Sequence, residues 1–229
     1  MSKITERATE SGALARLQRL KSAYQSFIKL NYEQAAEDCR TCPTRGLCCT
    51  DAHFVNVHIT RLEACAIRET LSRSPRLTEE ARRAVYQRAR QAVKLYGLRA
   101  TGETFKQTFA CPLYEPQSGC LVHRRAKPAP CIQHACYQNW EDLPPTRLQT
   151  RAEHRIEQLN TEVYGAAWAW LPLPVWLCLV DPEGSGAQLE KLAAEWSTQS
   201  VRQRGNFFYR ERQASRKVIH KRMSLPVIN

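Results

Sequence analysis

The sequence predicts a mainly α-helical fold with one or two short strands and irregular loops that carry most of the cysteines. Three observations predict it. Apolar residues recur at helical spacing in several long segments, while only one short segment alternates as a strand does. Eight of the ten cysteines fall within residues 39–49 and 111–136, which are expected to be loops. With 229 residues, 43% of them hydrophobic, the chain is expected to be globular and to bury a core.

The first helix is expected within residues 11–30, where apolar side chains return every three or four positions. Residues 53–59 alternate apolar and polar side chains, which predicts a short strand. The apolar face of that strand would carry Val55, Val57 and Ile59.

Two further helices follow this strand. Thr60 and Glu63 have the spacing of a capping box, so a helix should begin at Arg61. Thr78 is a suitable N-cap for the next helix, and Gly97 suits its C-terminal end. The region is therefore expected to form two capped helices in succession.

Helices are also expected over residues 147–164 and 188–198. Residues 163–180 carry no charge and have the minimum length of a membrane span. Pro172 and Pro174 would interrupt a helix in the middle of this segment. The segment is therefore expected to be buried in the protein, and no membrane span is expected.

The compartment decides how the cysteines are interpreted. No apolar signal-peptide core follows the first seven residues, so we expect a cytoplasmic protein. Thiols stay reduced in the cytosol, and clustered cysteines there are better explained as metal ligands than as disulfides.

The cysteines form two runs. The first cysteine run is Cys39-x2-Cys42-x5-Cys48-Cys49, and the second is Cys111-x8-Cys120-x10-Cys131-x4-Cys136. Two residues between cysteines let both thiolates reach one ion, and zinc and iron–sulfur clusters each take four such ligands. Adjacent Cys48 and Cys49 point in different directions, so one ion rarely takes both. This favours two centres or a multinuclear centre, and therefore an iron–sulfur cluster over zinc.

Other residues have weaker claims as ligands. Cys65 and Cys178 lie in apolar surroundings and are expected to be ordinary buried cysteines. His123 and His134 fall inside the second run and could replace a thiolate. His53 and His58 flank the expected strand and are weaker candidates still.

The first run resembles the signature of the YkgJ-type cysteine-cluster proteins, a family described as zinc- or iron-chelating domains. Three later elements also resemble that family's, in the same order: Cys111-Pro112-Leu113, the segment 119–123 and the segment 125–131. The resemblance covers roughly residues 39–137 and implies metal binding, with the two cysteine runs in one region of the fold. Lys127, His123 and Ile132 stand where the family has Arg, Tyr and Arg, so the resemblance implies no role for these side chains.

Residues 1–200 are expected to form a single cysteine-cluster domain, and residues 201–229 a basic tail. The formal net charge is +12, and residues 201–222 alone hold eight basic residues and one acid. Interleaved aromatic and basic side chains are typical of surfaces that stack on bases and contact phosphates. The tail is therefore a candidate for nucleic-acid binding through Arg202, Arg204, Phe208, Tyr209, Arg210 and Arg212. A solvated tail, or one that docks on an acidic partner, is the alternative.

Whether the protein is an enzyme stays open in the sequence. Some proteins with the same cluster resemble flagellin lysine N-methylases, which implies S-adenosylmethionine-dependent chemistry as one alternative; redox chemistry is another. No Gly-rich phosphate loop follows a predicted strand, and Gly184-Ser185-Gly186 is better explained as a linker. A CxxC can act as a redox dithiol, but Cys39 and Cys42 lack the surrounding βαβ pattern.

Overall fold

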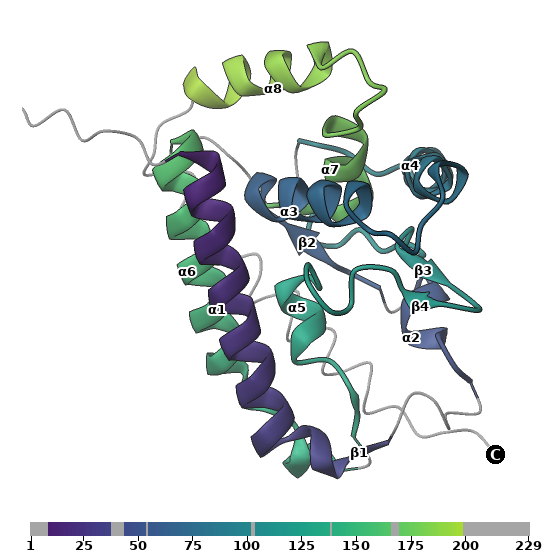
Figure 1. Cartoon of the computed structure of the whole chain (residues 1–229), viewed down its shortest axis with the longest axis vertical. Helices are drawn as coiled ribbons and strands as arrows, with labels where there is room; N and C mark the ends of the chain where they lie inside the picture. The colour runs from purple at the N-terminus through teal and green to yellow at the C-terminus, as the bar shows by residue number, and fades with distance from the viewer. Residues whose placement is uncertain are drawn as a thin grey trace, which may run out of the picture.

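The structure, a computed structural model, describes residues 9–37, 44–53, 55–101, 104–137, 139–165 and 170–198 (Figure 1). As expected, the fold is mainly helical. Its α-helices are α1 (Glu10–Asn31), α2 (Leu47–Thr50), α3 (Arg61–Ser72), α4 (Glu79–Leu95), α5 (Ala129–Ile132), α6 (Thr146–Tyr164), α7 (Leu173–Leu179) and α8 (Ala187–Thr198). Short 3-10 helices lie at Glu33–Ala35 (η1) and Trp140–Asp142 (η2).

Among the described residues, six two-residue strands pair antiparallel in three separate pairs. They are β1 (Ala36–Glu37) with β5 (Cys136–Tyr137), β2 (His58–Ile59) with β6 (Leu171–Pro172), and β3 (Tyr114–Glu115) with β4 (Gly119–Cys120). These pairs are more numerous and shorter than the one or two strands expected from the sequence. They join loops to one another and do not form an extended sheet.

The strand expected over residues 53–59 is wrong in its extent, because only His58 and Ile59 form β2. The alternating segment before it bonds to two different partners. The amide of Phe109 donates to the carbonyl of Val55 at 3.0 Å, and the amide of Leu173 donates to the carbonyl of Val57 at 2.9 Å. Since these bonds lead to separate segments, no continuous ladder forms.

The predicted caps of α3 and α4 are confirmed. Thr60 Oγ1 accepts from the Glu63 amide, and Glu63 Oε2 accepts from the Thr60 amide, each at 3.3 Å, which completes the capping box. Thr78 Oγ1 accepts from an amide in the first turn of α4 at 3.2 Å. At the other end of α4, Gly97 has a φ of +59°, and the chain beyond it closes the helix through a backbone hydrogen bond.

Helices α1 and α6 lie side by side, and α5 rests against both (Figure 1). Leu17 of α1 and Ile156 of α6 are buried in the cluster between them, which also reaches Leu62 of α3. At the solvent side, Arg16 of α1 forms an ion pair with Glu162 of α6. Helix α5 thus packs on both of these long helices.

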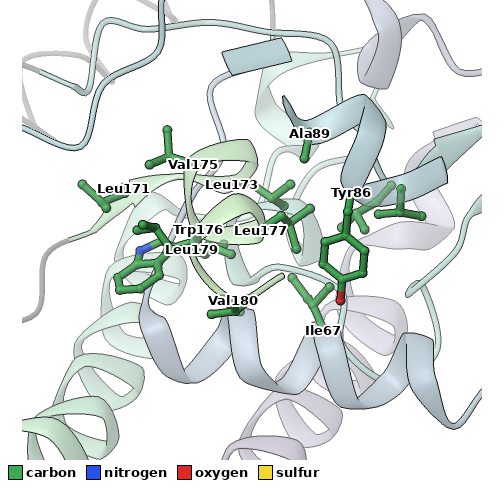
Figure 2. Packing of buried hydrophobic residues seen from close by; sticks show 14 of the residues in the cluster. Ile67, Tyr86, Ala89, Leu171, Leu173, Val175, Trp176, Leu177, Leu179 and Val180 are labelled. Atoms are coloured by element: carbon green, nitrogen blue, oxygen red, sulfur yellow. The ribbon is translucent and has the colours of Figure 1, made fainter. Parts of the chain in front are cut away.

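A second apolar cluster joins α3, α4 and α7 (Figure 2). Trp176 and Leu177 of α7 are fully buried and belong to the same cluster as Ile67 of α3 and Tyr86 of α4. The uncharged segment predicted to be buried supplies α7, and Pro172 forms the N-cap of this short helix. No helix among the described residues is long and apolar enough to cross a membrane.

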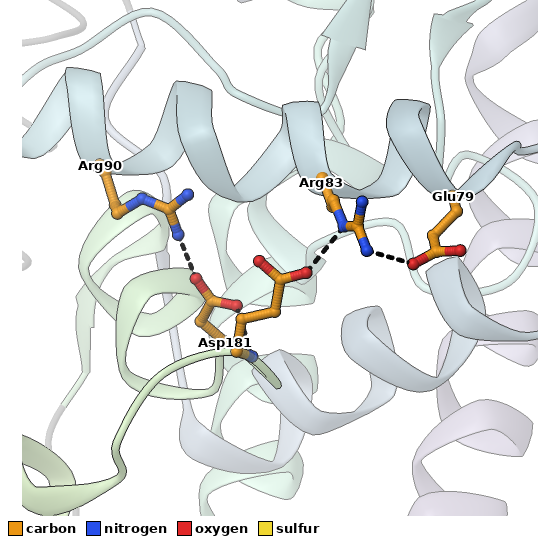
Figure 3. Close-up of polar contacts among 5 residues, drawn as sticks. Glu79, Arg83, Arg90 and Asp181 are labelled. Atoms are coloured by element: carbon orange, nitrogen blue, oxygen red, sulfur yellow. Dashed lines mark hydrogen bonds and ion pairs between the residues drawn. The ribbon is translucent and has the colours of Figure 1, made fainter.

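Ion pairs fasten α4 to the turn that follows α7 (Figure 3). Arg83 donates to Glu183 at 2.8 Å and pairs with Glu79 one turn away, while Arg90 pairs with Asp181. Arg82, Arg83, Arg88 and Arg90 of α4 carry positive charge of the kind that nucleic-acid binding uses. In the structure much of this charge is taken up by acids of the same chain.

Candidate metal centre

The first cysteine run is described only in its second half. Cys39 and Cys42 lie outside the described residues. Cys48 and Cys49 form the middle of α2, which begins after Gly46, a residue with a φ of +87°. Non-glycine residues rarely adopt this left-handed conformation, so glycine is what allows the loop to turn into α2.

The second run meets the first at the loop before β3. The amide of Cys111 donates to the carbonyl of Cys49 at 2.7 Å, so these two cysteines are backbone neighbours although sixty-one residues separate them. The β3–β4 hairpin that follows carries Cys120 directly opposite Tyr114. The expectation that the second run folds back onto the first is confirmed at this point.

Tyr114 of the same hairpin contacts the loop before α2. The hydroxyl of Tyr114 donates to the carbonyl of Arg45 at 3.2 Å. Its ring lies so close to Gly46 that a Cβ added there would be 1.9 Å from the Tyr114 hydroxyl oxygen. Absence of a side chain at Gly46 therefore serves two purposes, since it permits the turn and leaves room for the tyrosine.

Helix α5 brings Cys131 to the same region. Pro128 is its N-cap, and the amide of Cys131 donates to the Pro128 carbonyl at 2.9 Å. The first amide of α5, that of Ala129, donates to Glu63 Oε1 at 3.1 Å. The fully buried Glu63 of α3 therefore fixes the position of the short helix that carries Cys131.

Cys136 is placed by the β1–β5 pair, in which it lies opposite Glu37. Glu37 comes two residues before Cys39 in the sequence. The second run thus approaches the first at both ends, at Cys136 beside the segment that leads to Cys39 and at Cys111 beside Cys49.

The thiols influence one another's ionisation. Hydrogen bonds with Cys49 and His134 lower the pKa of Cys48, whereas the bond to Cys48, together with burial and nearby Cys111 and Cys131, raises the pKa of Cys49. Burial raises the pKa of Cys111 to about 12, with the neighbouring Cys120 acting in the same direction. Thiols from both runs therefore share one partly buried region.

Basic side chains surround this region. Burial raises the pKa values of Cys120 and Cys131, and the positive charges of Lys127 and Lys21 oppose that rise at both thiols. Arg88 of α4 acts in the same way on Cys111 and donates to the carbonyl of Pro112 at 3.0 Å. These basic side chains thus offset only part of the effect of burial, which disfavours negative charge on the sulfur atoms.

No family model, curated protein or solved structure matches the chain. The likeness to the cysteine-cluster family accordingly rests on the quoted residues alone. Among the residues that the structure describes, no group of three or more His, Cys, Asp or Glu side chains is arranged to hold a metal ion.

The histidines considered as ligands lie in different surroundings. His134 hydrogen-bonds to Cys48 and belongs to the cluster region. His58 is buried, has its Nε2 3.0 Å from the Thr104 carbonyl oxygen and stacks on Phe105, and is thus held in the core. His53 lies in a turn closed by Asp51.

Cys65 and Cys178 belong to the cluster of α3, α4 and α7, as expected. Cys65 is buried in α3, and its sulfur accepts a hydrogen bond from the Tyr164 hydroxyl at 3.6 Å. Burial raises the pKa values of both thiols. Tyr164 and Glu10 also act on the pKa of Cys65, and Arg90 and Asp181 on that of Cys178; none of these groups belongs to the two cysteine runs.

One residue of the region was missed in the sequence. Lys21 is buried on the inner face of α1, in line with Ala13, Leu17 and Ile28. Lys21 occupies a position at which the apolar repeat of the helix predicts a hydrophobic side chain. Because lysine is almost never fully buried without a partner, such a position indicates a buried ion pair. The sequence predicted a role for its partner, Glu63, only in the capping box of α3.

Proposed function

We propose that this protein binds a metal centre, zinc or an iron–sulfur cluster, through its two cysteine runs. The proposed ligands are drawn from Cys39, Cys42, Cys48, Cys49, Cys111, Cys120, Cys131 and Cys136. The observation that carries the proposal is the hydrogen bond between the Cys111 amide and the Cys49 carbonyl, which joins runs far apart in the sequence. The resemblance to the YkgJ-type family supports the same conclusion.

The chemistry of the region suits such a centre. The eight described cysteines are free thiols, and those of the two runs are partly buried. Thiolates are the preferred ligands of structural zinc and of iron–sulfur clusters. Metal binding would replace the thiol protons, and the charge of the ion would offset the repulsion between the thiolates that it brings together.

Adjacent cysteines favour more than one metal position. Consecutive residues of a helix point about 100° apart, because 3.6 residues make one turn. In α2 the Cys48 and Cys49 thiols hydrogen-bond to each other, and their further neighbours differ: His134 for Cys48, and Cys111 and Cys131 for Cys49. Adjacent thiols with different further neighbours suit a multinuclear centre better than a single ion.

Purification under anaerobic conditions, followed by elemental analysis and a visible spectrum, tests the proposal. A coloured protein with iron and sulfide identifies an iron–sulfur centre, and a colourless protein with stoichiometric zinc identifies zinc. A full-length, folded protein that contains neither metal and takes up neither would contradict the proposal.

Two other functions from the sequence have less support. A cavity of about 280 Å³, lined by residues that include Arg61, Arg68 and Leu189, is at the lower limit of pockets that hold small molecules. It would be small for a nucleoside cofactor such as S-adenosylmethionine, and binding of that cofactor would have to be measured directly. The residues proposed to bind nucleic acid all lie outside the described part of the chain.

A further inference from the structure

A cavity of about 280 Å³ lies between α3, the turn after α7 and the start of α8. Among the described residues, no cysteine of the two runs lines it. Arg61 and Arg68 of α3 both line it, because seven residues make about two helical turns and so place the two side chains on one side of the helix. The cavity therefore has two arginines on its α3 side, apart from the proposed metal centre.

The two arginines are held differently. The Arg61 guanidinium lies over the ring of Tyr164, 4.2 Å from the ring centre. Arg68 Nη2 is 4.0 Å from Glu10 Oε1, which is too far for a hydrogen bond, and the Arg68 guanidinium makes no hydrogen bond to any described residue. The other oxygen of Glu10 accepts from the Tyr164 hydroxyl at 2.5 Å. Arg68 therefore keeps its donors for a ligand.

The cavity carries an excess of positive charge. Its second carboxylate, Asp181, pairs with Arg90 of α4 (Figure 3) and accepts from the amide of Glu183 at 3.0 Å. Burial raises the pKa values of Cys65 and Tyr164, so both groups are neutral at neutral pH. With Arg90 included, three arginines stand against two carboxylates, which leaves one positive charge for an anion.

Another part of the cavity wall is apolar. Leu179 and Val180 at the end of α7 line it, together with Leu189 of α8. Leu179 and Val180 are only 7% and 4% exposed and belong to the cluster of α3, α4 and α7. An inorganic anion would gain nothing from these side chains, whereas an apolar chain attached to an anionic group would bury surface against them.

We infer that this cavity binds a small organic carboxylate, whose anionic group pairs with Arg68 and whose apolar chain packs on Leu179, Val180 and Leu189. A guanidinium can hold a carboxylate through two parallel N–H···O bonds, and Arg61 adds positive charge on the same side. The volume limits the ligand to a short chain, since pockets for drug-sized molecules begin at about 300 Å³. The inference does not depend on the proposed metal centre.

Titration of the full-length protein with straight-chain carboxylates, followed in heteronuclear NMR spectra, tests the inference. Hexanoate should shift the amide signals of residues at the cavity. Affinity should rise about two- to fourfold with each methylene from acetate through butyrate to hexanoate, because each methylene leaves water. Hexanol lacks the charge and inorganic phosphate lacks the chain, so both should bind more weakly than hexanoate. No shift with hexanoate, or equal binding of hexanol or phosphate, would overturn the inference.

Two substitutions separate the charge from the chain. Arg68→Gln should weaken the binding of every carboxylate about five- to tenfold and leave the increase per methylene unchanged, which also shows that the cavity is intact. Leu189→Ser should lower the increase per methylene and leave the affinity for acetate near that of the wild type. An unchanged increase in Leu189→Ser would overturn the placement of the chain.

Arg73→Gln is the matched control. Arg73 follows the same helix, is 73% exposed and lies outside the cavity, where it pairs with Glu69. Its substitution removes the same charge from the protein and should leave hexanoate binding as in the wild type. Equal weakening by Arg68→Gln and Arg73→Gln would overturn the inference, because Arg68 would then act only through the net charge of the protein.

Discussion

The amide of Cys111 donates to the carbonyl of Cys49 at 2.7 Å, which makes two cysteines from different runs immediate neighbours. The bond fixes the backbone of α2 against the loop before the β3–β4 hairpin. Side chains from both segments consequently enter one region, and neither segment needs a sheet or a long helix to hold it there. A structure of this kind tolerates short, irregular cysteine-bearing loops because the helices around them supply the rigidity.

Replacing a cysteine of the first run should remove metal and lower stability. Cys49→Ser and Cys42→Ser are each expected to reduce the metal content and the melting temperature, because a bound structural metal contributes directly to the free energy of folding. Metal per chain is measured by elemental analysis, and melting by circular dichroism before and after treatment with a chelator.

Cys178→Ser is the matched control. Cys178 lies in α7, is partly exposed, and has Arg90 and Asp181 as the charged groups that act on its thiol. It should keep the wild-type metal content. If Cys49→Ser and Cys178→Ser retain the same metal, the cysteine runs are not the ligands.

Local sequence signals predicted the helices well, for reasons visible in particular residues. Thr60 with Glu63, and Thr78 with Gly97, mark ends that depend on neighbouring residues only, and the structure has all of them. The strand pairs could not be predicted in this way. Two-residue strands have no periodicity, and β2 exists because Leu171 and Pro172 reach it from more than one hundred residues away.

The arrangement of the site was predictable only in part. The two cysteine runs could be found by spacing, and their approach to each other was expected from the resemblance. Their contact through Cys111 and Cys49 depends on tertiary folding. The buried Lys21 of α1 could not be predicted either, because its pairing with the buried Glu63 of α3 also depends on tertiary folding.

The two ion pairs of α1 should differ greatly in their contributions to stability. Lys21→Met leaves Glu63 buried without its partner charge and should lower the free energy of unfolding by about 3–5 kcal/mol. Arg16→Met breaks a pair whose side chains are 48% and 41% exposed, and should cost at most about 1 kcal/mol. Urea unfolding of the two variants beside the wild type measures the difference. Similar small losses in both would show that the buried pair contributes no more to stability than a surface pair.

The basic tail is expected to determine any binding to nucleic acid. If residues 201–229 contact phosphates, affinity for single-stranded RNA or DNA should fall steeply with salt, since each neutralised phosphate releases counterions. Deleting these residues should abolish that binding and leave the metal content unchanged, because no cysteine lies beyond Cys178. Fluorescence anisotropy at several salt concentrations checks both expectations. Equal binding by the truncated protein, or none by the full chain at low salt, would leave the tail as a solvated segment or one that docks on an acidic partner.

Gly46 should be the least replaceable glycine among those described. Gly46→Ala would place a methyl group 1.9 Å from the Tyr114 hydroxyl oxygen and 2.1 Å from the adjoining ring carbon. It would also hold a non-glycine residue at a φ of +87°, which alone costs about 1–2 kcal/mol. The variant should therefore lose more than about 2 kcal/mol of stability, and it should lose metal as well, because α2 with Cys48 and Cys49 begins at this residue.

Gly119→Ala separates the two causes of that loss. Gly119 also has a positive φ, of +72°, but an added Cβ there would meet nothing within 4 Å. It should show only the conformational cost of about 1–2 kcal/mol. Tyr114→Ala removes the ring that an added Cβ at Gly46 would meet. The double variant Gly46→Ala/Tyr114→Ala should therefore be less stable than Tyr114→Ala alone by only about 1–2 kcal/mol, the same loss as for Gly119→Ala. An unchanged cost in that background would mean that the contact with Tyr114 is not what constrains the loop.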